Sequence, residues 1–320
     1  AVYPGFTQQW VSNAYSQHFL TYLLFTFSMW LMVLCVRRRE CRGVLMPLSV
    51  LSALLSMLTM EYFVTLELLR PLVLWFLLRT DGDNLRTTLK RLALYWLPYL
   101  LALAFFGVYR FSIYPSISPN PESNAPSLLL GLASAPLDSI LRLFEIALQD
   151  FIHLNLFSWA AVVAPGTIEL QARVVWFSWV VGLGAALLYA VMSGTFSDWE
   201  EDGSQASGQG FLFGVSAVLL GGLPVWLTDR QMIVGMWSDR FSLAPMLGGA
   251  LLLVWLVVWL SRTRQQREVI LVLLLGFSIA SQIRTANKYR LNWELQRDYY
   301  WQLSWRAPGL EPGTMVLATR

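Results

Sequence analysis

Three ionisable side chains, Glu61, Glu67 and Arg70, interrupt a run that is otherwise almost entirely apolar. A charged group at the centre of a bilayer costs about 2.5–3.5 kcal/mol, so each needs a partner or a function. The spacing of Glu67 and Arg70 places them on one helical face and predicts an intramembrane ion pair. Glu61 has two interpretations: a structural group at the outer interface, or a catalytic base or ligand at the lip of an outward-facing cavity.

Two Asp-Arg dipeptides, Asp229-Arg230 and Asp239-Arg240, supply a second set of charged groups. The arginine guanidinium is a planar fork of donors that suits a phosphate group. At a membrane surface, the phosphate groups available belong to lipids. We therefore expect Arg230 and Arg240 to bind a lipid phosphate. In the alternative interpretation, each arginine pairs with its neighbouring aspartate or with phospholipid headgroups.

The other reactive residue types form no recognisable centre. Neither His18 nor His153 has a cysteine or an acid pair nearby, so we expect packing roles for both and no metal site. Cys35 and Cys41 lack a CxxC or metal-ligand spacing and are expected to be free thiols. The chain also lacks a P-loop, and a net charge of +3 is too small to indicate nucleic acid as a partner.

The elements that must position these groups are membrane helices. Hydrophobic residues make up 56% of the chain and charged residues only 13%, about half the charged share of soluble domains. A spanning helix needs about 20 mostly apolar residues. The candidates are residues 19–36, 44–60, 62–78, 92–109, 174–192, 211–227 with 244–260 as a pair, and 269–283. The predicted fold class is all-α, a polytopic transmembrane helical bundle of about seven or eight spans.

Three short loops are rich in arginine and lysine: 37–42, 79–91 and 262–267. The positive-inside rule makes them cytoplasmic and places both termini extracytosolic, in what we expect to be the bacterial inner (plasma) membrane. Residues 44–78 must then cross twice, as a hairpin that breaks near Glu61 instead of one long helix. Loop 193–210 would be cytoplasmic although it is acidic and has no Lys or Arg. Its sidedness stays open, because a further span within 143–163 would move it outside.

Residues 111–172 form the predicted extracytosolic segment. A Pro/Ser/Asn-rich loop over 114–126 is followed by an amphipathic helix within 137–163, where apolar residues recur every three or four positions. We expect this helix to lie in the outer membrane interface. The transmembrane domain therefore covers 1–286, and the polar and aromatic residues 287–320 are expected to form an extracytosolic interfacial tail that leads into a further domain.

Three stretches resemble, in order, the membrane core of the C-type (GT-C) glycosyltransferases: residues 2–13 (VYPGFTQQWVSN), 55–71 (LSMLTMEYFVTLELLRP) and 238–248 (SDRFSLAPMLG). The likeness is greatest to the transmembrane O-mannosyltransferases with tetratricopeptide repeats. It maps Glu61 onto a family glutamate and Arg240 onto a family arginine. Tyr3 and Met60 replace a family histidine and a family lysine.

The resemblance implies an enzyme that transfers a sugar from a polyprenyl-phosphate donor to an acceptor at the extracytosolic face, with inversion. A carboxylate would take the acceptor proton, and Arg240 with Arg230 would hold the leaving lipid phosphate. A divalent metal would suit this chemistry, although no ligand set is visible. The family's catalytic carboxylate lies in the first extracytosolic loop, before the stretch that opens this chain, and residues 1–36 contain no Asp or Glu. Either that acid lies upstream in a longer protein, or the fold has lost its chemistry.

The second function class is a non-catalytic membrane subunit, whose spans serve as packing surface in a larger complex. The 15 Trp, 18 Phe and 12 Tyr fit such a surface and equally fit an aromatic belt at the membrane interfaces. A transporter is a weaker third class, because the sequence has neither paired broken helices nor two similar halves. Membrane lipids are expected partners in every case, and the choice between enzyme and subunit stays open.

Overall fold

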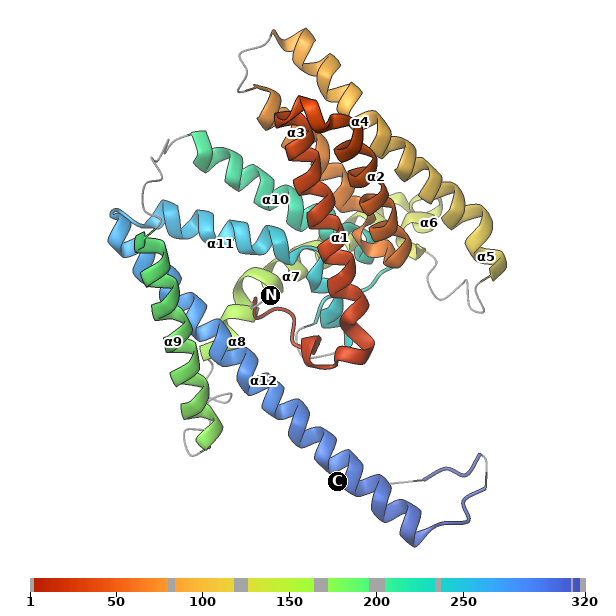
Figure 1. Ribbon diagram of the computed structural model, residues 1–320. Coiled ribbons are helices and arrows are strands. Elements are labelled where there is room, and N and C mark those ends of the chain that lie inside the picture. Colours follow the sequence, from red (N-terminus) through yellow and green to blue (C-terminus); the bar gives the residue numbers. More distant parts are fainter. Residues whose placement is uncertain are drawn as a thin grey trace.

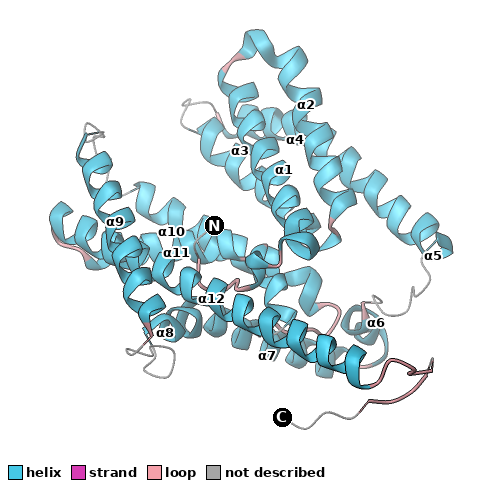
Figure 2. Cartoon of the chain, turned by 60° about the horizontal axis from the view of Figure 1, so that its bottom comes forward, coloured by secondary structure: helices cyan, strands magenta, loops and turns pink. Residues whose placement is uncertain are grey.

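The computed structural model describes residues 3–79, 84–117, 126–163, 172–195, 205–233, 237–311 and 313–316. Within these ranges all regular structure is helical, which confirms the predicted all-α class (Figures 1 and 2). Seven of the described helices are long and apolar enough to cross a membrane.

The first two helices, α1 (Ser12–Arg37) and α2 (Arg42–Thr59), form an antiparallel hairpin. Two serines join them at mid-length. Ser28 Oγ donates to Ser49 O at 2.6 Å, and Ser49 Oγ donates to Ser28 O at 2.7 Å. Such small polar residues let two membrane helices approach closely and hydrogen-bond across their contact.

The chain turns back after α2 at Met60, where φ is −146° and ψ is 114°. A 3-10 segment, η3 (Glu61–Leu69), and the short helix α3 (Arg70–Arg79) then run back along α1 and α2. Leu78 near the end of α3 shares a core cluster with Val36 near the end of α1. The predicted break near Glu61 is therefore confirmed.

The predicted span over 62–78 is not a single α-helix, because its first part is 3-10. Pro71 lacks the N–H that an α-helical bond to the carbonyl of Glu67 would need, and proline is tolerated only in the first turn of a helix. The tighter 3-10 turns also rise further per residue. Together, η3 and α3 extend over about 33 Å, enough to cross a hydrocarbon core of about 30 Å.

Helix α4 (Leu85–Val108) continues into a π-helical turn, η4 (Tyr109–Ile113), and one α-helical turn, α5 (Tyr114–Ile117). The loop predicted over 114–126 is therefore wrong at its start. The wider π turn leads into Pro115, whose missing N–H an uninterrupted α-helix would require. Residues 118–125 of that predicted loop lie outside the described residues.

Four consecutive elements form a crosspiece at one end of the bundle: α6 (Ser127–Ser134), α7 (Pro136–Ile152), η6 (His153–Phe157) and α8 (Ser158–Val163). It contacts the N-terminal segment, the end of α10 (Gln205–Trp226), the start of α11 (Met246–Leu260) and the middle of α12 (Arg264–Arg306). Asp150 accepts from the backbone N–H of Met232, and Arg284 donates to the carbonyl of Val162. The crosspiece thus contains the helix predicted within 137–163, although it is also long and apolar enough to count among the seven candidate spans.

Helix α7 leaves part of its apolar surface exposed, although Ile146 is fully buried. Apolar side chains such as Ile140 and Phe144 are exposed, Phe144 by 67%, whereas the polar Ser139 and Asp150 are buried. Arg142 meets Asp229 on the protein side at 3.1 Å. An apolar face that no described part of the chain covers is what a helix in contact with lipid requires.

The remaining helices are α9 (Arg173–Thr195), α10 (Gln205–Trp226), α11 (Met246–Leu260) and α12 (Arg264–Arg306). Glycines allow their two antiparallel contacts. A Cβ on Gly182 of α9 would lie 2.5 Å from the carbonyl oxygen of Gly276 in α12, and one on Gly248 of α11 would lie 2.5 Å from the carbonyl oxygen of Gly214 in α10. The predicted span 244–260 is shorter than expected, since Ala244 and Pro245 belong to a turn and α11 has only 15 residues.

Helix α12 has 43 residues and is about 64 Å long at the α-helical rise, twice the thickness of a hydrocarbon core. It reaches the N-terminal segment at Gln282, whose Nε2 donates to the carbonyls of Tyr3 and Phe6 at 3.2 Å. Beyond this point it continues past the rest of the bundle, with Trp301 and Trp305 exposed (Figure 1). The tail predicted over 287–320 therefore starts as an unbroken part of this helix.

The helix directions place the basic loops together. The α1–α2 connection, the facing ends of α3 and α4, and the α11–α12 connection lie at the end of the bundle opposite to the N-terminal segment and the crosspiece. The end of α9 and the start of α10 share the end that holds the basic loops, because α9 runs antiparallel to α12. The predicted cytoplasmic loops thus share one end of the structure.

Candidate functional site

The three stretches of the sequence resemblance meet at the end opposite to the basic loops. Thr7 donates its backbone N–H to Asp239 Oδ2 at 3.1 Å, and its hydroxyl bonds to the same carboxylate. Tyr62 at the start of η3 packs edge-on against Phe241, with ring centroids 5.8 Å apart. One buried cluster includes Tyr3, Tyr62 and Leu243, so residues far apart in the chain share a single core here.

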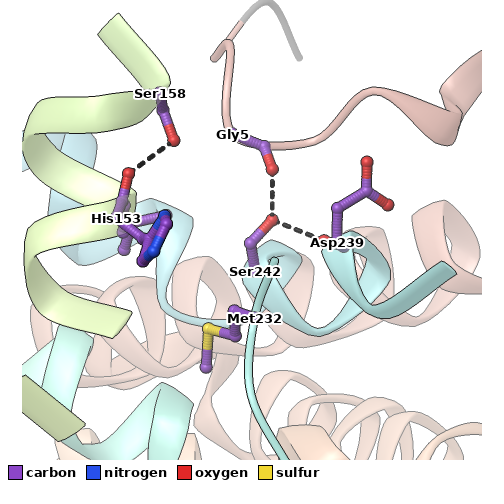
Figure 3. A pocket seen from close by; sticks show the side chains of 7 residues that line it. Gly5, His153, Ser158, Met232, Asp239 and Ser242 are labelled. Atoms are coloured by element: carbon purple, nitrogen blue, oxygen red, sulfur yellow. Dashed lines mark hydrogen bonds between the residues drawn. The ribbon is translucent and has the colours of Figure 1, made fainter. Parts of the chain in front are cut away.

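A short 3-10 segment, η8 (Trp237–Leu243), is fixed to the N-terminal segment beside a small pocket (Figure 3). Ser242 Oγ lies 2.8 Å from the carbonyl oxygen of Gly5 and 2.6 Å from that of Asp239. The carboxylate of Asp239 points away from Ser242 in this view. Because Asp239 is fully buried against Thr7, its role in the structure is to anchor η8 and thereby Arg240.

Tyr3 occupies the position at which the resemblance has a histidine. Its hydroxyl donates to the carbonyl of Leu154 at 2.8 Å, and its ring stands edge-on to Trp159 at 5.5 Å. Burial raises the pKa of Tyr3 to about 12, because the phenolate would be desolvated. Tyr3 is therefore a neutral donor that ties the N-terminal segment to the crosspiece.

A cavity of about 500 Å³ opens at this end. Its walls come from η3, α4 with η4, the start of α6 and the end of α10. Most of the lining is apolar, including Leu103, Phe106 and Val225, and the charged side chains that line it among the described residues are Glu61, Arg110 and Arg230. Within the described part of the chain, the lining thus holds two cations and one anion.

Glu61 lies at the edge of the cavity and forms an ion pair with Arg110 in the π turn η4. The guanidinium of Arg110 also stacks on the ring of Tyr114, 4.3 Å from its centroid. Arg110 is a residue that sequence reasoning missed, because the predicted span ended at Tyr109. The signal was present: Arg110 is the one charged residue between Arg91 and Glu122.

Arg230 is positioned by the turn that ends α10. The backbone N–H of Asp229 bonds to the carbonyl of Trp226 at 2.9 Å, and that of Arg230 to the carbonyl of Val225 at 3.3 Å. This is the Schellman arrangement, in which the residue after the helix is left-handed; Asp229 has a φ of 55° where glycine is usual. The turn directs Arg230 to the cavity wall.

Asp150 of α7 holds the same turn from outside. Its carboxylate accepts from Trp226 Nε1 at 2.7 Å and from the backbone N–H of Met232 at 3.0 Å. It is a further residue missed at the sequence level, although an acid beside Phe151 and Ile152 on a predicted amphipathic helix was a visible signal.

Arg240 does not line the cavity but lies directly behind its wall. Both arginines approach the ring of Phe241, Arg240 Cζ at 4.8 Å from the centroid and Arg230 Cζ at 5.9 Å. Phe241 itself lines the cavity. The structure therefore brings Glu61, Arg230 and Arg240 to one end and one cavity, with only Arg240 outside the lining.

Glu67 and Arg70 lie elsewhere, buried between α1, η3 and α4. Arg70 pairs with both carboxylate oxygens of Glu67, donates to Ser28 Oγ at 2.8 Å, and stacks on Tyr99 at 4.1 Å. This pair takes no part in the cavity.

Among the described residues no group of three or more His, Cys, Asp and Glu side chains could hold a metal ion. His18 is buried beside Tyr15 and Tyr62, and His153 lies in the crosspiece against Phe157. Cys35 is buried, Cys41 is exposed, and both are free thiols.

Comparison with protein-family models, with curated proteins and with solved structures finds no match for this chain. Its all-helical architecture, with seven candidate spans and a charged share of 13%, defines the class: a polytopic integral membrane protein.

Proposed function

We propose that the cavity binds a polyprenyl phosphate that carries a sugar, and that the protein transfers this sugar to an acceptor as a GT-C-like enzyme. The observation that carries the proposal is an apolar cavity of about 500 Å³ with Arg110 and Arg230 on its wall. An amphiphile with an anionic head needs both features, since its chain is buried against apolar side chains and its phosphate is held by guanidinium groups.

Each charged residue then has a task. Arg230 binds the lipid phosphate, and Arg240 behind Phe241 adds positive potential as charge develops on the leaving phosphate. Glu61 is the candidate base that accepts the proton of the acceptor hydroxyl while the bond from the sugar to the phosphate oxygen breaks. A phosphate that engages Arg110 would weaken the pair between Arg110 and Glu61 and release the carboxylate for this step.

The arrangement of the ends supports an extracytosolic site. Basic loops favour the cytoplasmic side, and in this structure they lie at the end away from the cavity. The crosspiece, with its exposed apolar face, would then rest in the outer interface beside the cavity. A lipid donor could enter from the membrane without crossing it.

Binding tests the proposal directly. The purified protein in nanodiscs is titrated with polyprenyl phosphate and, separately, with the uncharged polyprenol of the same length. We expect the phosphate to bind more tightly, and Arg230→Gln to weaken its binding roughly tenfold or more, because a hydrogen-bonded charge partner is lost. Polyprenol binding should not change.

Arg142→Gln is the matched control, since it removes the same charge from an arginine that pairs with Asp229 and Glu145 outside the cavity lining. Equal affinities for phosphate and polyprenol, or equal effects of the two substitutions, would refute the phosphate site.

Turnover tests the enzyme. Transfer from a lipid-linked sugar should be abolished by Arg240→Ala, with the fold retained. Turnover that survives Arg240→Ala would show that Arg240 does not stabilise the leaving phosphate.

One observation favours the second candidate function, a non-catalytic subunit. The last part of α12 extends beyond the bundle with Trp293, Tyr300, Trp301 and Trp305 each more than half exposed. Exposed aromatic residues are enriched at protein interfaces. Under this candidate the wild-type protein has no turnover, and Arg240→Ala at most weakens assembly, as measured by the size of the complex on native gels.

A further inference from the structure

Two rings form the wall of the cavity next to Arg240. Tyr62 and Phe241 both line the cavity and pack edge-on against each other. His18 lies next to Tyr62, with ring centroids 5.7 Å apart, and Arg240 lies against Phe241. Since neither His18 nor Arg240 lines the cavity, both sit directly behind this aromatic wall.

Two polar atoms of this cluster are buried and make no hydrogen bond to any described residue. In the described part of the chain, neither Tyr62 Oη nor His18 Nδ1 has a hydrogen-bond partner. Tyr62 is only 8% exposed and His18 only 4%. A buried polar atom without a partner costs free energy, so proteins rarely keep one that serves no purpose.

Two buried tyrosines elsewhere in the protein, Tyr3 and Tyr99, are satisfied. Tyr3 Oη bonds to the carbonyl of Leu154 at 2.8 Å, and Tyr99 Oη lies 2.6 Å from Ser49 Oγ. Tyr62 differs from them in being both unpartnered and part of the cavity wall. The missing partner of Tyr62 is thus expected to come from whatever fills the cavity.

The chemistry of the cluster indicates what that group is. A phenol, an imidazole and a guanidinium offer hydrogen bonds, and the rings of Tyr62 and Phe241 offer flat apolar surface. Several hydroxyl groups on a compact ring, attached to a phosphate, match this combination.

We infer that His18 and Tyr62, backed by Arg240, form the subsite for the sugar of the glycosylated lipid, which is reached when the ring of Phe241 turns aside. The inference rests on the proposed function, because it assigns the headgroup of the same ligand. Arg230 holds the phosphate at the cavity wall, while His18 and Tyr62 recognise hydroxyl groups of the sugar.

The test compares polyprenyl phosphate with its mannosyl and glucosyl derivatives of the same chain length, together with thermal unfolding of each variant in nanodiscs. Tyr62→Phe removes only the unpartnered hydroxyl. We expect the affinity for a glycosylated lipid to fall about fivefold to tenfold, the affinity for polyprenyl phosphate to stay the same, and the melting temperature not to fall.

Tyr99→Phe is the matched control, because it removes the hydroxyl of a buried tyrosine that is satisfied by Ser49. Its melting temperature should fall while both affinities stay unchanged. His18→Phe keeps the ring packing between Tyr15 and Tyr62 and should reproduce the selective loss seen with Tyr62→Phe.

The outcomes separate the two proposals. If Arg230→Gln weakens binding of every phosphorylated lipid but Tyr62→Phe and His18→Phe leave the preference for the glycosylated forms unaltered, the sugar subsite is refuted and the phosphate site stands. Equal losses for glycosylated and unglycosylated lipid also refute it, since the hydroxyl would then serve the phosphate. If the wild-type protein binds no phosphorylated lipid, the proposed function fails and the subsite with it.

Discussion

Glu61 and Glu67 belong to the same 3-10 segment, yet their two ion pairs lie in opposite surroundings. Glu67 pairs with Arg70 three residues on, and both side chains are almost completely buried, at 4% and 0% exposure. Glu61 pairs with Arg110 on another helix, at the edge of the cavity, with side-chain exposures of 44% and 18%.

The difference lies in what else surrounds each pair. Arg70 also bonds to Ser28 and stacks on Tyr99, so three helical elements meet around a charge that has no route to water or ligand. Arg110 has the ring of Tyr114 on one side and the cavity on the other. A fully enclosed pair secures helices, whereas a pair at a cavity edge can exchange its partner for a ligand.

The largest effect should come from breaking the enclosed pair. Arg70→Leu leaves the carboxylate of Glu67 buried and unpaired, and we expect a loss of about 3–5 kcal/mol in the free energy of unfolding. Unfolding in mixed micelles with increasing SDS measures it. The double variant Glu67→Leu with Arg70→Leu should recover much of the loss, and a double variant no better than the single one would contradict an electrostatic origin.

The second largest effect on stability should come from a helix contact that involves no charges. Gly182→Val places a Cβ 2.5 Å from the carbonyl oxygen of Gly276 and 3.3 Å from Ala280 Cβ, and we expect overpacking to cost about 1–3 kcal/mol between α9 and α12. Gly184→Val on the same helix is the control, because a Cβ at Gly184 meets nothing within 4 Å. Equal stabilities in the same SDS titration would argue against a close α9–α12 contact.

The smallest effect on stability should come from the pair at the cavity edge. Glu61→Gln should change the free energy of unfolding by less than about 1 kcal/mol, as is usual for partly exposed ion pairs. Glu61→Gln should also strengthen binding of polyprenyl phosphate. The carboxylate of Glu61 no longer competes with the phosphate for Arg110, and the cavity lining loses one negative charge. Glu145→Gln, in the exposed pair with Arg142, serves as control for binding. A large loss of stability in Glu61→Gln would place this pair with the structural one.

Features of the fold that depend only on residues close together in the chain could be predicted from the sequence. The run of apolar residues predicts the helices, and the break near Glu61 followed from charge counting and is found at Met60. The exact ends of the helices were harder to predict. The loop predicted from Tyr114 begins as a helix, because a π turn precedes Pro115. The 3-10 segment before Pro71 could not be predicted from apolar periodicity, because that pattern does not distinguish a 3-10 helix from an α-helix.

The candidate site shows the same division. The sequence singled out Glu61, Arg230 and Arg240 by residue type, but not that Arg110 would face Glu61 or that Phe241 would approach both other arginines. It also assigned His18 to packing, because the unpartnered state of a buried nitrogen is visible only when its neighbours are known.

By itself the sequence determined that this chain is a membrane protein with apolar helices. It also identified the charged residues that need a partner or a function within the bilayer. Both follow because transfer free energies are nearly additive along a chain. The tertiary structure alone decided which charges meet. The rotation of each helix and the crossing of the α6–α8 crosspiece set the partners of Arg110, the position of Arg230 and the exposed face of α7. These depend on contacts between residues 49 to 87 positions apart in the chain.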